Sequence, residues 1–315
     1  MSKMRVAVSV ITYQRPEGLR RLLEGLAGLT FDKTGSPDLR IAVVDNDAAG
    51  SARTLCEKSA SSFPWPLTYR VEPRRGIPFA RNASVAAAGD VDFLVFVDDD
   101  EVPEPGWLEE LLRVQRTTGA DVVAGPALPY FDGAIPDWVV KSKFFERARF
   151  ATGAPVAPAF VATNNVLVRR GVLEEVARGG EVFDERYAMS GGSDTNLFMR
   201  VHRAGHRMVW ADGAVARDWI PASRARAAWI LQRAYRFGNT LAICERDLDP
   251  STRTRLARIV KGGGHVVQGF LLLPLAVLGR HELVGALRRV CRGAGMLSGT
   301  LGLRYQEYRR KTHGA

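Results

Sequence analysis

Short apolar runs alternate with amphipathic stretches over the first hundred residues of the chain. Four runs rich in β-branched and apolar residues read as strands, and the stretches between them repeat leucine or alanine at helical spacing. Strand–helix alternation of this kind predicts a parallel sheet with right-handed crossovers, and therefore an α/β fold. The predicted strands are 4–13, 39–44, 67–71 and 93–97, and the predicted helices are 17–29, a stretch ending near residue 60, and 74–88.

The fourth predicted strand runs directly into four acids. Residues 93–97 are apolar without interruption, as in a strand buried on both faces, and Asp98, Asp99, Asp100 and Glu101 follow. Ligands of α/β proteins bind where the carboxyl ends of strands emerge. On an extended backbone Asp98 and Asp100 project to one side and Asp99 to the other, so the first two repel each other unless a cation lies between them. A hard divalent ion with phosphate oxygens fits this role; the alternative is a solvated acidic turn that caps the next helix.

The alternation is looser beyond the acids. Two glycines, Gly191 and Gly192, predict a turn, and Ser193 after them is a candidate helix cap. The other elements predicted here are strands at 121–130, 160–169 and 208–220, and helices from about 106, at 171–178, from 193 and at 229–245.

The composition is that of a globular protein, with 46% hydrophobic and 25% charged residues in a chain of 315. Three widely separated cysteines form neither a disulfide framework nor a zinc-binding spacing, which suits a reducing cytosol. The N-terminus leads directly into a strand and lacks the apolar stretch of a signal peptide, so we expect a cytoplasmic protein.

The net charge of +10 lies entirely at one end of the chain. Residues 251–315 hold 12 Lys and Arg against 2 Asp and Glu, which leaves residues 1–250 with 32 of each sign. Lys and Arg spread over a folded face would favour nucleic acid. A neutral body with a basic and apolar tail favours an anionic membrane surface instead, so no nucleic-acid partner is expected.

The loop after the first strand excludes two common nucleotide sites. A dinucleotide-binding Rossmann domain needs Gly-x-Gly-x-x-Gly at this point, where the chain has Thr12-Tyr-Gln-Arg15-Pro16. No Walker-type phosphate loop is present either.

Five motifs occur in order over residues 4–240. They are Thr12-Tyr-Gln-Arg15, Val43-Val44-Asp45-Asn46, Gly76-Ile-Pro-Phe-Ala-Arg81-Asn82, Asp98-Asp99-Asp100 and Gly191-Gly192-Ser193-Asp194. Together they resemble the family 2 glycosyltransferases, which are inverting enzymes with the GT-A fold. Ser193 stands where that family has Glu, and the Arg233–Thr240 stretch and the tail are similar to bacterial polysaccharide-assembly members.

The resemblance implies a metal-dependent hexosyltransferase of cell-surface polysaccharide biosynthesis. It would move a sugar from a nucleotide-diphosphate donor, with a UDP-sugar expected, to a hydroxyl of a glycan acceptor, expected to be lipid-linked. Asp194 would be the catalytic base, with Asp184 and Glu185 as fallback candidates. Asp100, together with Asp98, would bind a Mn²⁺ or Mg²⁺ ion that bridges the diphosphate, and Asp98 would also sit by the ribose.

The remaining implied roles concern the donor and the acceptor. Thr12, Arg15 and Asp45 would hold the base and ribose, Arg81 would lie near base or diphosphate, and Arg233 and Arg236 would add positive charge unless they form a solvated helix face. The full implied donor set is Thr12, Arg15, Asp45, Arg81, Asp98, Asp99, Arg233 and Arg236, and the acceptor set is Asn164, Asn165, Gly192 and Ser193.

The implied fold is a GT-A domain, a Rossmann-like and mostly parallel sheet flanked by helices, with a helical C-terminal extension. We expect the catalytic domain at 1–222, with a donor half at 1–100 and an acceptor half at 101–222, and a basic, apolar region at 223–315.

The C-terminal region is expected to bind a membrane without crossing it. Residues 266–279 form an apolar stretch of 14 residues, whereas a spanning helix needs about 20. Residues 281–292 place apolar side chains on one side and arginines elsewhere, the pattern of an interfacial helix. The chain would then be peripheral or monotopic at the inner face of the plasma membrane; the alternative is an ordinary helical cap on the catalytic domain.

Two other functions compete with this hypothesis. A nucleotidylyltransferase on a related fold would need a glycine-rich phosphate loop after the first strand, and a basic nucleic-acid-binding protein would need excess Lys and Arg outside the tail. Neither feature is present in the sequence.

Overall fold

The computed structural model describes residues 3–307, which form two compact units. The first unit comprises Met1–Pro129, Arg147–Ala188 and Leu197–Trp219, and the second comprises Tyr130–Glu146, Met189–Asn196 and Ile220–Ala315. Each unit is described by itself below.

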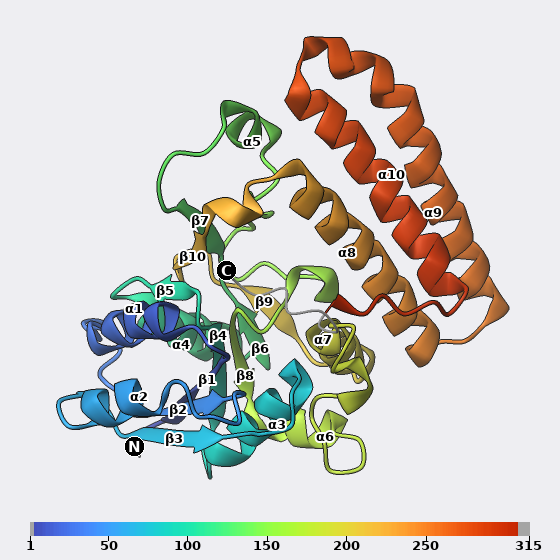
Figure 1. Cartoon of the computed structure of the whole chain (residues 1–315). Coiled ribbons are helices and arrows are strands. Elements are labelled where there is room, and N and C mark those ends of the chain that lie inside the picture. The colour runs from blue at the N-terminus through green and yellow to red at the C-terminus, as the bar shows by residue number, and fades with distance from the viewer. Residues whose placement is uncertain (1–2, 308–315) are drawn as a thin grey trace. The chain divides into compact units, whose positions relative to one another are not determined.

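A seven-stranded mixed sheet forms the centre of the first unit (Figure 1). Strands β1 to β4 pair in parallel, β8 lies antiparallel between β4 and β6, and β9 pairs in parallel with β6. The mostly parallel sheet of the predicted GT-A fold is thereby confirmed. In spatial order the strands are β3 (Leu67–Val71), β2 (Asp38–Asp45), β1 (Arg5–Thr12), β4 (Phe93–Asp98), β8 (Asn165–Arg169), β6 (Val122–Ala124) and β9 (Met208–Trp210).

Helices cover both faces of this sheet, and each face has its own apolar core. One core joins the leucines of α1 and α4 to the side chains of β1, β2 and β4 that point to that side. The other core joins α3, α6 and α7 to the alternate residues of the same sheet. The bounds are α1 (Pro16–Ala27), α2 (Arg53–Ala60), α3 (Ile77–Ala87), α4 (Trp107–Thr118), α6 (Arg170–Val176) and α7 (Ser193–Arg203), with short 3₁₀ turns η1 (Pro158–Phe160) and η2 (Glu185–Tyr187).

The central strand β4 shows why two covered faces require an unbroken apolar run. Val95 and Val97 belong to one core and Leu94 and Phe96 to the other, and all four are fully buried. A strand covered on both sides cannot alternate apolar with polar residues, so its sequence is continuous rather than periodic.

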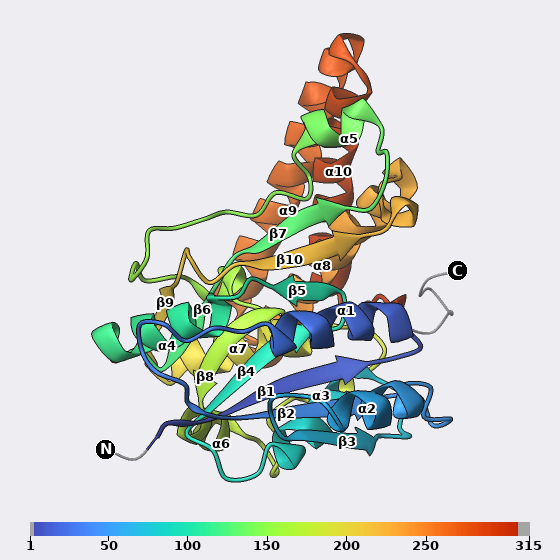
Figure 2. The same ribbon diagram turned by 90° about the vertical axis from the view of Figure 1, so that its left-hand side faces the viewer.

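A three-stranded sheet holds the order β5-β10-β7, which Figure 2 shows above α1. Its strands are β5 (Glu101–Pro103), β10 (Ala216–Ile220) and β7 (Ala127–Phe131). The single strand expected at 121–130 is therefore wrong, because it divides at Gly125-Pro126 into β6 and β7 of different sheets. A Cβ at Gly125 would lie 2.4 Å from the carbonyl oxygen of Ala214, so the chain turns where only glycine fits.

Helices dominate the second unit, and α10 packs against both α8 and α9 (Figure 1). Glycines allow close approach of these helices: a Cβ at Gly295 of α10 would meet the Tyr235 oxygen of α8, and a Cβ at Gly269 of α9 would meet Val290 of α10. The elements are α5 (Asp137–Ser142), η3 (Ala222–Arg224), α8 (Ala227–Leu248), α9 (Thr252–Leu272), η4 (Leu273–Leu278) and α10 (Arg280–Thr300).

Two details of the predicted tail differ from the structure. The expected interfacial helix at 281–292 is the first part of α10, where Val284 is buried and Val290 packs on α9, while Leu283 stays 37% exposed. Much of its apolar side is therefore used inside the unit. The helical segment that contains the apolar stretch is also longer than 14 residues, because α9 and η4 continue from Thr252 to Leu278. Within these 27 residues an 18-residue window has a mean hydropathy of 1.3, so the segment is long and apolar enough to cross a membrane by length and composition.

Candidate active site

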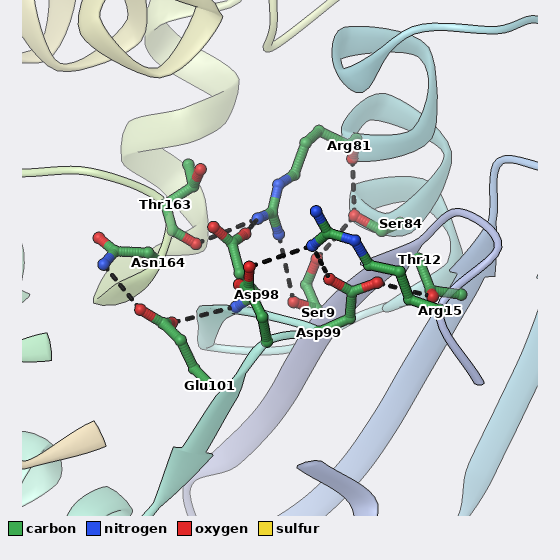
Figure 3. A network of polar contacts seen from close by, with 11 residues as sticks. Ser9, Thr12, Arg15, Arg81, Ser84, Asp98, Asp99, Glu101, Thr163 and Asn164 are labelled. Atoms are coloured by element: carbon green, nitrogen blue, oxygen red, sulfur yellow. Dashed lines mark hydrogen bonds and ion pairs between the residues drawn. The ribbon is translucent and has the colours of Figure 1, made fainter. Parts of the chain in front are cut away.

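The candidate site lies at the carboxyl ends of β1 and β4 in the first unit, where polar side chains form the network of Figure 3. Strand β4 ends at Asp98, and the chain then turns at Asp99 and Asp100 before β5 begins. This turn changes the expected alternation of side chains. Asp99 and Asp100 share one cation, while Asp98 has a different one.

Arg15 is the cation shared by two of the three aspartates. Its Nη1 donates to Asp99 Oδ1 at 3.0 Å and to Asp100 Oδ2 at 3.1 Å, and Thr12 Oγ1 donates to Asp99 Oδ2 at 2.8 Å. Gln14 has a φ of 53°, and Pro16 then begins α1, so the loop after β1 directs Arg15 toward the acids. The predicted loop and the predicted acids thus lie together in the fold, and their pairing emerges only in three dimensions.

Electrostatics in this cluster are governed by burial. Burial raises the pKa of Asp99, and the positive charge of Arg15 opposes that rise. Burial would lower the pKa of Arg15, but the charges of Asp99 and Asp100 outweigh it, so the pKa of Arg15 is raised. Arg15 thus stays a cation at any pH at which the protein is folded.

Arg81 is the second cation, and it is almost completely buried at 1% exposure. Its guanidinium pairs with Asp98, and it also donates to the Thr163 carbonyl at 3.2 Å and the Ser9 carbonyl at 3.4 Å (Figure 3). A buried guanidinium with these partners fixes Asp98 relative to β1 and to the segment before β8.

Glu101 is a buried structural acid that was not among the predicted site residues. Its carboxylate accepts from Asn164 Nδ2 at 2.8 Å and from the Asp98 backbone N–H at 3.2 Å (Figure 3). Burial raises the pKa of Glu101 well above its usual range, and the charges of Asp98 and Asp218 add to this. Its burial could not be read from an acidic run in the sequence.

Two predicted ligand contacts are used up inside the fold. Asp45 is fully buried, and its carboxylate accepts from the N–H groups of Asp47 and Ala52 and from the Tyr69 hydroxyl. It therefore closes the loop after β2 rather than facing a nucleotide.

Asn165 is the second of these. It is 2% exposed, accepts from Trp107 Nε1 at 2.8 Å, and donates to the carbonyls of Pro126 and Ala214. These contacts use the hydrogen-bonding capacity of its amide, so Asn165 holds the edge of the sheet and is not kept as an acceptor contact.

An amide beside Asp45 positions the α3 loop and was not among the predicted site residues. Asn46 donates from Nδ2 to the carbonyls of Glu72 and Arg74 and accepts from the Gly76 N–H. Only its place at the end of β2 could have indicated this role.

Asp194 lies in the second unit, at the start of α7. It is partly exposed, and its Oδ1 accepts from the Thr195 N–H at 2.7 Å. Gly191 and Gly192 before it both have positive φ, of 72° and 97°. A Cβ at Gly192 would lie 2.2 Å from Thr240 of α8, so this loop is seated on α8 where a side chain would not fit.

Arg233 and Arg236 also belong to the second unit, on α8. The Arg233 guanidinium lies 4.8 Å from the centre of the Phe237 ring, and Arg236 is paired with Glu307. Ser193, the first residue of α7, is 3% exposed.

The residues present fit a divalent cation only together with a substrate. Within residues 3–307 no group of three or more His, Cys, Asp or Glu converges as a complete protein cage. Asp98 and Asp100 nevertheless retain side-chain exposures of 40% and 20%, and they offer hard carboxylate oxygens. Mg²⁺ and related ions are commonly held by one or two carboxylates plus substrate phosphates, which is the arrangement that this pair allows.

Comparisons with known proteins decide the family. The family model described as glycosyl transferase family 2 matches residues 7–177, and the succinoglycan biosynthesis protein ExoM of Rhizobium meliloti (strain 1021) is 33% identical over 96% of this chain and 94% of its own length. The chain belongs to glycosyl transferase family 2. A second model, glycosyl transferase family group 2, matches residues 93–292.

Solved structures support the GT-A fold of this glycosyltransferase. The mannosyltransferase PcManGT from Pyrobaculum calidifontis, solved with GDP-Man and Mn²⁺, superposes with a TM-score of 0.61 at 18% identity over 95% of this chain and 88% of that one. Residues 1–349 of TarS from S. aureus, solved with UDP, give a TM-score of 0.53 at 18% identity over 97% and 93%. At these identities the likeness concerns the fold.

Proposed function

We propose that this glycosyltransferase transfers a sugar from a nucleotide-diphosphate donor to a hydroxyl of a glycan acceptor, with inversion at the anomeric carbon. The observation that supports this proposal most is the Asp98-Asp99-Asp100 turn at the end of β4. Thr12 and Arg15 contact this turn through Asp99 and Asp100, and Arg81 contacts it through Asp98. In a family 2 chain this arrangement offers the partly exposed Arg15 cation and hard oxygen ligands to a diphosphate, while buried Arg81 fixes Asp98.

The proposed donor site is built from residues of the first unit. Thr12 and Arg15 contact the nucleotide, Asp99 holds both of them in place, and Arg81 orients Asp98. Asp98 and Asp100 would hold Mn²⁺ or Mg²⁺, which when bound supplies charge stabilisation for the departing diphosphate. The structure solved with Mn²⁺ for PcManGT supports this choice of ion.

The proposed chemistry is a single displacement. The acceptor hydroxyl attacks the anomeric carbon, the bond from that carbon to the diphosphate oxygen breaks, and Asp194 accepts the hydroxyl proton. Arg233 and Arg236 add positive charge for the leaving group, which for Arg236 requires release from Glu307. Asn164 and Gly192 are the proposed acceptor contacts. Ser193 is buried at the start of α7, so its proposed role is to position the start of this helix.

The donor and acceptor classes are proposed from the relatives and from the tail. TarS was solved with UDP and with UDP-GlcNAc, which supports a UDP-sugar. ExoM is named for succinoglycan biosynthesis, which supports a cell-surface polysaccharide product. The basic tail supports a lipid-linked acceptor at the cytoplasmic face of the membrane.

A donor screen tests the proposal. Purified protein is incubated with UDP-, GDP- and dTDP-sugars and Mn²⁺, and the released nucleotide is identified. A glycosyltransferase releases the nucleoside diphosphate. A nucleotidylyltransferase would instead consume the nucleotide-sugar only when pyrophosphate is added, and would form the nucleoside triphosphate and the sugar 1-phosphate. Asp100→Ala and excess EDTA should both abolish turnover; full turnover in either case would remove the metal from the proposal.

The role of the base is tested by a matched pair of variants. Asp194→Asn keeps the shape of the side chain but cannot accept the proton, so kcat should fall by about 10²–10⁴ with little change in donor binding. Asp184→Asn is the control, because Asp184 is already paired with Arg186. Normal turnover in Asp194→Asn together with loss in Asp184→Asn would transfer the role of base to Asp184.

A further inference from the structure

Helix α9 carries a row of exposed apolar side chains along its outward side. We define the apolar stripe as Leu256, Val260, Val267, Phe270, Leu271 and, in η4, Val277. Exposure along it is high, reaching 66% at Val260, 73% at Leu271 and 87% at Val277. The stripe residues of α9 recur at helical spacing and therefore share one face of the helix. Isolated exposed apolar residues, which are normal on a protein surface, would not be aligned in this way.

The opposite face of α9 is fixed against α10. A Cβ at Gly262 would lie 3.1 Å from Leu297, and a Cβ at Gly269 would lie 2.5 Å from Val290 and 2.8 Å from the Ala286 oxygen. Such close approach leaves α9 no room to rotate its outward side into the unit. Among the described residues of the second unit, the apolar stripe therefore has no helix to cover it.

The charge of this segment is of one sign. Between Thr252 and Leu278 there is no Asp or Glu, and Arg253, Arg255 and Lys261 are all exposed. A second copy of this chain would offer no Asp or Glu of its α9 to pair with these cations. An anionic surface instead complements both the apolar stripe and the cations.

The packing of α9 also determines its orientation in a bilayer. By length and composition the segment Thr252–Leu278 is able to cross a membrane. It is joined along its length to α10, however, and α10 carries Arg280, Glu282, Arg288, Arg289 and Arg292. Each arginine at the bilayer centre is unfavourable by about 2.5–3.5 kcal/mol, so the pair is not suited to cross together.

We propose that α9 and η4 lie flat in the interface of an anionic phospholipid bilayer, with the apolar stripe at the acyl boundary and Arg253, Arg255 and Lys261 among the headgroups. The inference deepens the membrane association in the proposed function. It moves the lipid-binding face from residues 281–292 of α10, where the sequence pattern placed it, to the outward face of α9.

Vesicle flotation with full-length protein tests the proposal. Vesicles of phosphatidylcholine with phosphatidylglycerol are compared with vesicles of phosphatidylcholine alone, at low and high salt. The test variant is Val267→Glu with Leu271→Glu. The control is Leu301→Glu with Leu303→Glu, which adds the same charge to two exposed leucines of the same unit outside the stripe.

Wild type and control should float with the anionic vesicles, less so at high salt, while the test variant should bind at least about tenfold more weakly. Equal flotation of the two double variants would overturn the assignment to α9. Protein that resists extraction by alkaline carbonate would indicate a spanning segment and overturn the flat orientation.

The protein could instead fail to bind the vesicles and form a dimer in solution. If the Val267→Glu and Leu271→Glu double variant dissociates that dimer, a second copy covers the stripe, which would overturn the proposal. Thermal stabilisation by UDP and Mn²⁺ is measured on the same samples. If that stabilisation persists without flotation, only the membrane inference fails, and if it is absent while flotation persists, the donor-site proposal fails instead.

Discussion

Replacing Gly295 with alanine should separate two helices that are in direct backbone contact. A Cβ at this position would lie 2.0 Å from the Tyr235 carbonyl oxygen and 3.0 Å from the Asn239 nitrogen. An ordinary carbon–oxygen contact needs more than 3 Å, so α8 and α10 must move apart by about 1 Å, which forfeits a quarter to a half of each packing contact across the seam.

Hydrogen bonds across the same seam should weaken as well. Ser298 Oγ of α10 lies 2.8 Å from the Tyr235 hydroxyl and 2.9 Å from Asn239 Nδ2, and both distances lengthen if the helices separate. Overpacking costs about 1–3 kcal/mol and each weakened bond about 1 kcal/mol, while alanine in a helix gains about 1 kcal/mol over glycine. The net loss in unfolding free energy should be about 2–4 kcal/mol.

Urea unfolding followed by circular dichroism provides the measurement, with Gly263→Ala as the matched control. Gly263 lies within α9, and a Cβ there meets nothing within 4 Å, so this variant should gain up to about 1 kcal/mol from helix propensity. If Gly295→Ala unfolds at the same urea concentration as Gly263→Ala, the close packing of α8 on α10 is refuted.

Two further variants test the candidate site. Arg15→Ala leaves buried Asp99 and its neighbour Asp100 without their shared cation, and should lower stability by about 2–3 kcal/mol after allowance for solvent screening. Excess Mn²⁺ should raise the melting temperature of this variant more than that of the wild type. A variant that melts at the same temperature as the wild type would contradict the ion pair. Asn165→Ala removes the acceptor of Trp107 Nε1 and one donor to each of the Pro126 and Ala214 carbonyls, of which Pro126 keeps the Ala216 N–H. It should lower stability by about 2–4 kcal/mol in urea unfolding, whereas a neutral effect would reopen a surface role for this amide.

The sequence pattern predicted the parts of the fold whose structure is decided locally. The strands β1 to β4 were located by apolar runs, and the acids at the end of β4 were located by the abrupt change to charge. Pairing was not predictable in the same way. The turn at Asp99 and Asp100 ends the two-residue alternation, so Arg15 could only be matched to them in three dimensions.

Residue type also does not reveal whether a polar side chain is already satisfied. Asp45 and Asn165 follow or begin strands at the ligand edge, as binding residues do, yet both are buried and hydrogen-bonded within the fold. The same limit applies to helices. Both α9 and α10 have apolar faces, and only the glycine contacts between them show which face is used for packing.

The threading of the chain through its two units has a consequence for recombination and engineering. The backbone passes from one unit to the other at five places, after Pro129, Glu146, Ala188, Asn196 and Trp219. A chimera that exchanges only the C-terminal region between two relatives would therefore combine 220–315 of one parent with Tyr130–Glu146 and Met189–Asn196 of the other. Asp194 belongs to the smallest of these segments. The Gly192 loop before it would then pack on an α8 that comes from the other parent. A working hybrid should require the three segments of the second unit, Tyr130–Glu146, Met189–Asn196 and 220–315, to come from the same parent. Substitutions in these three segments are therefore expected to occur together in related chains.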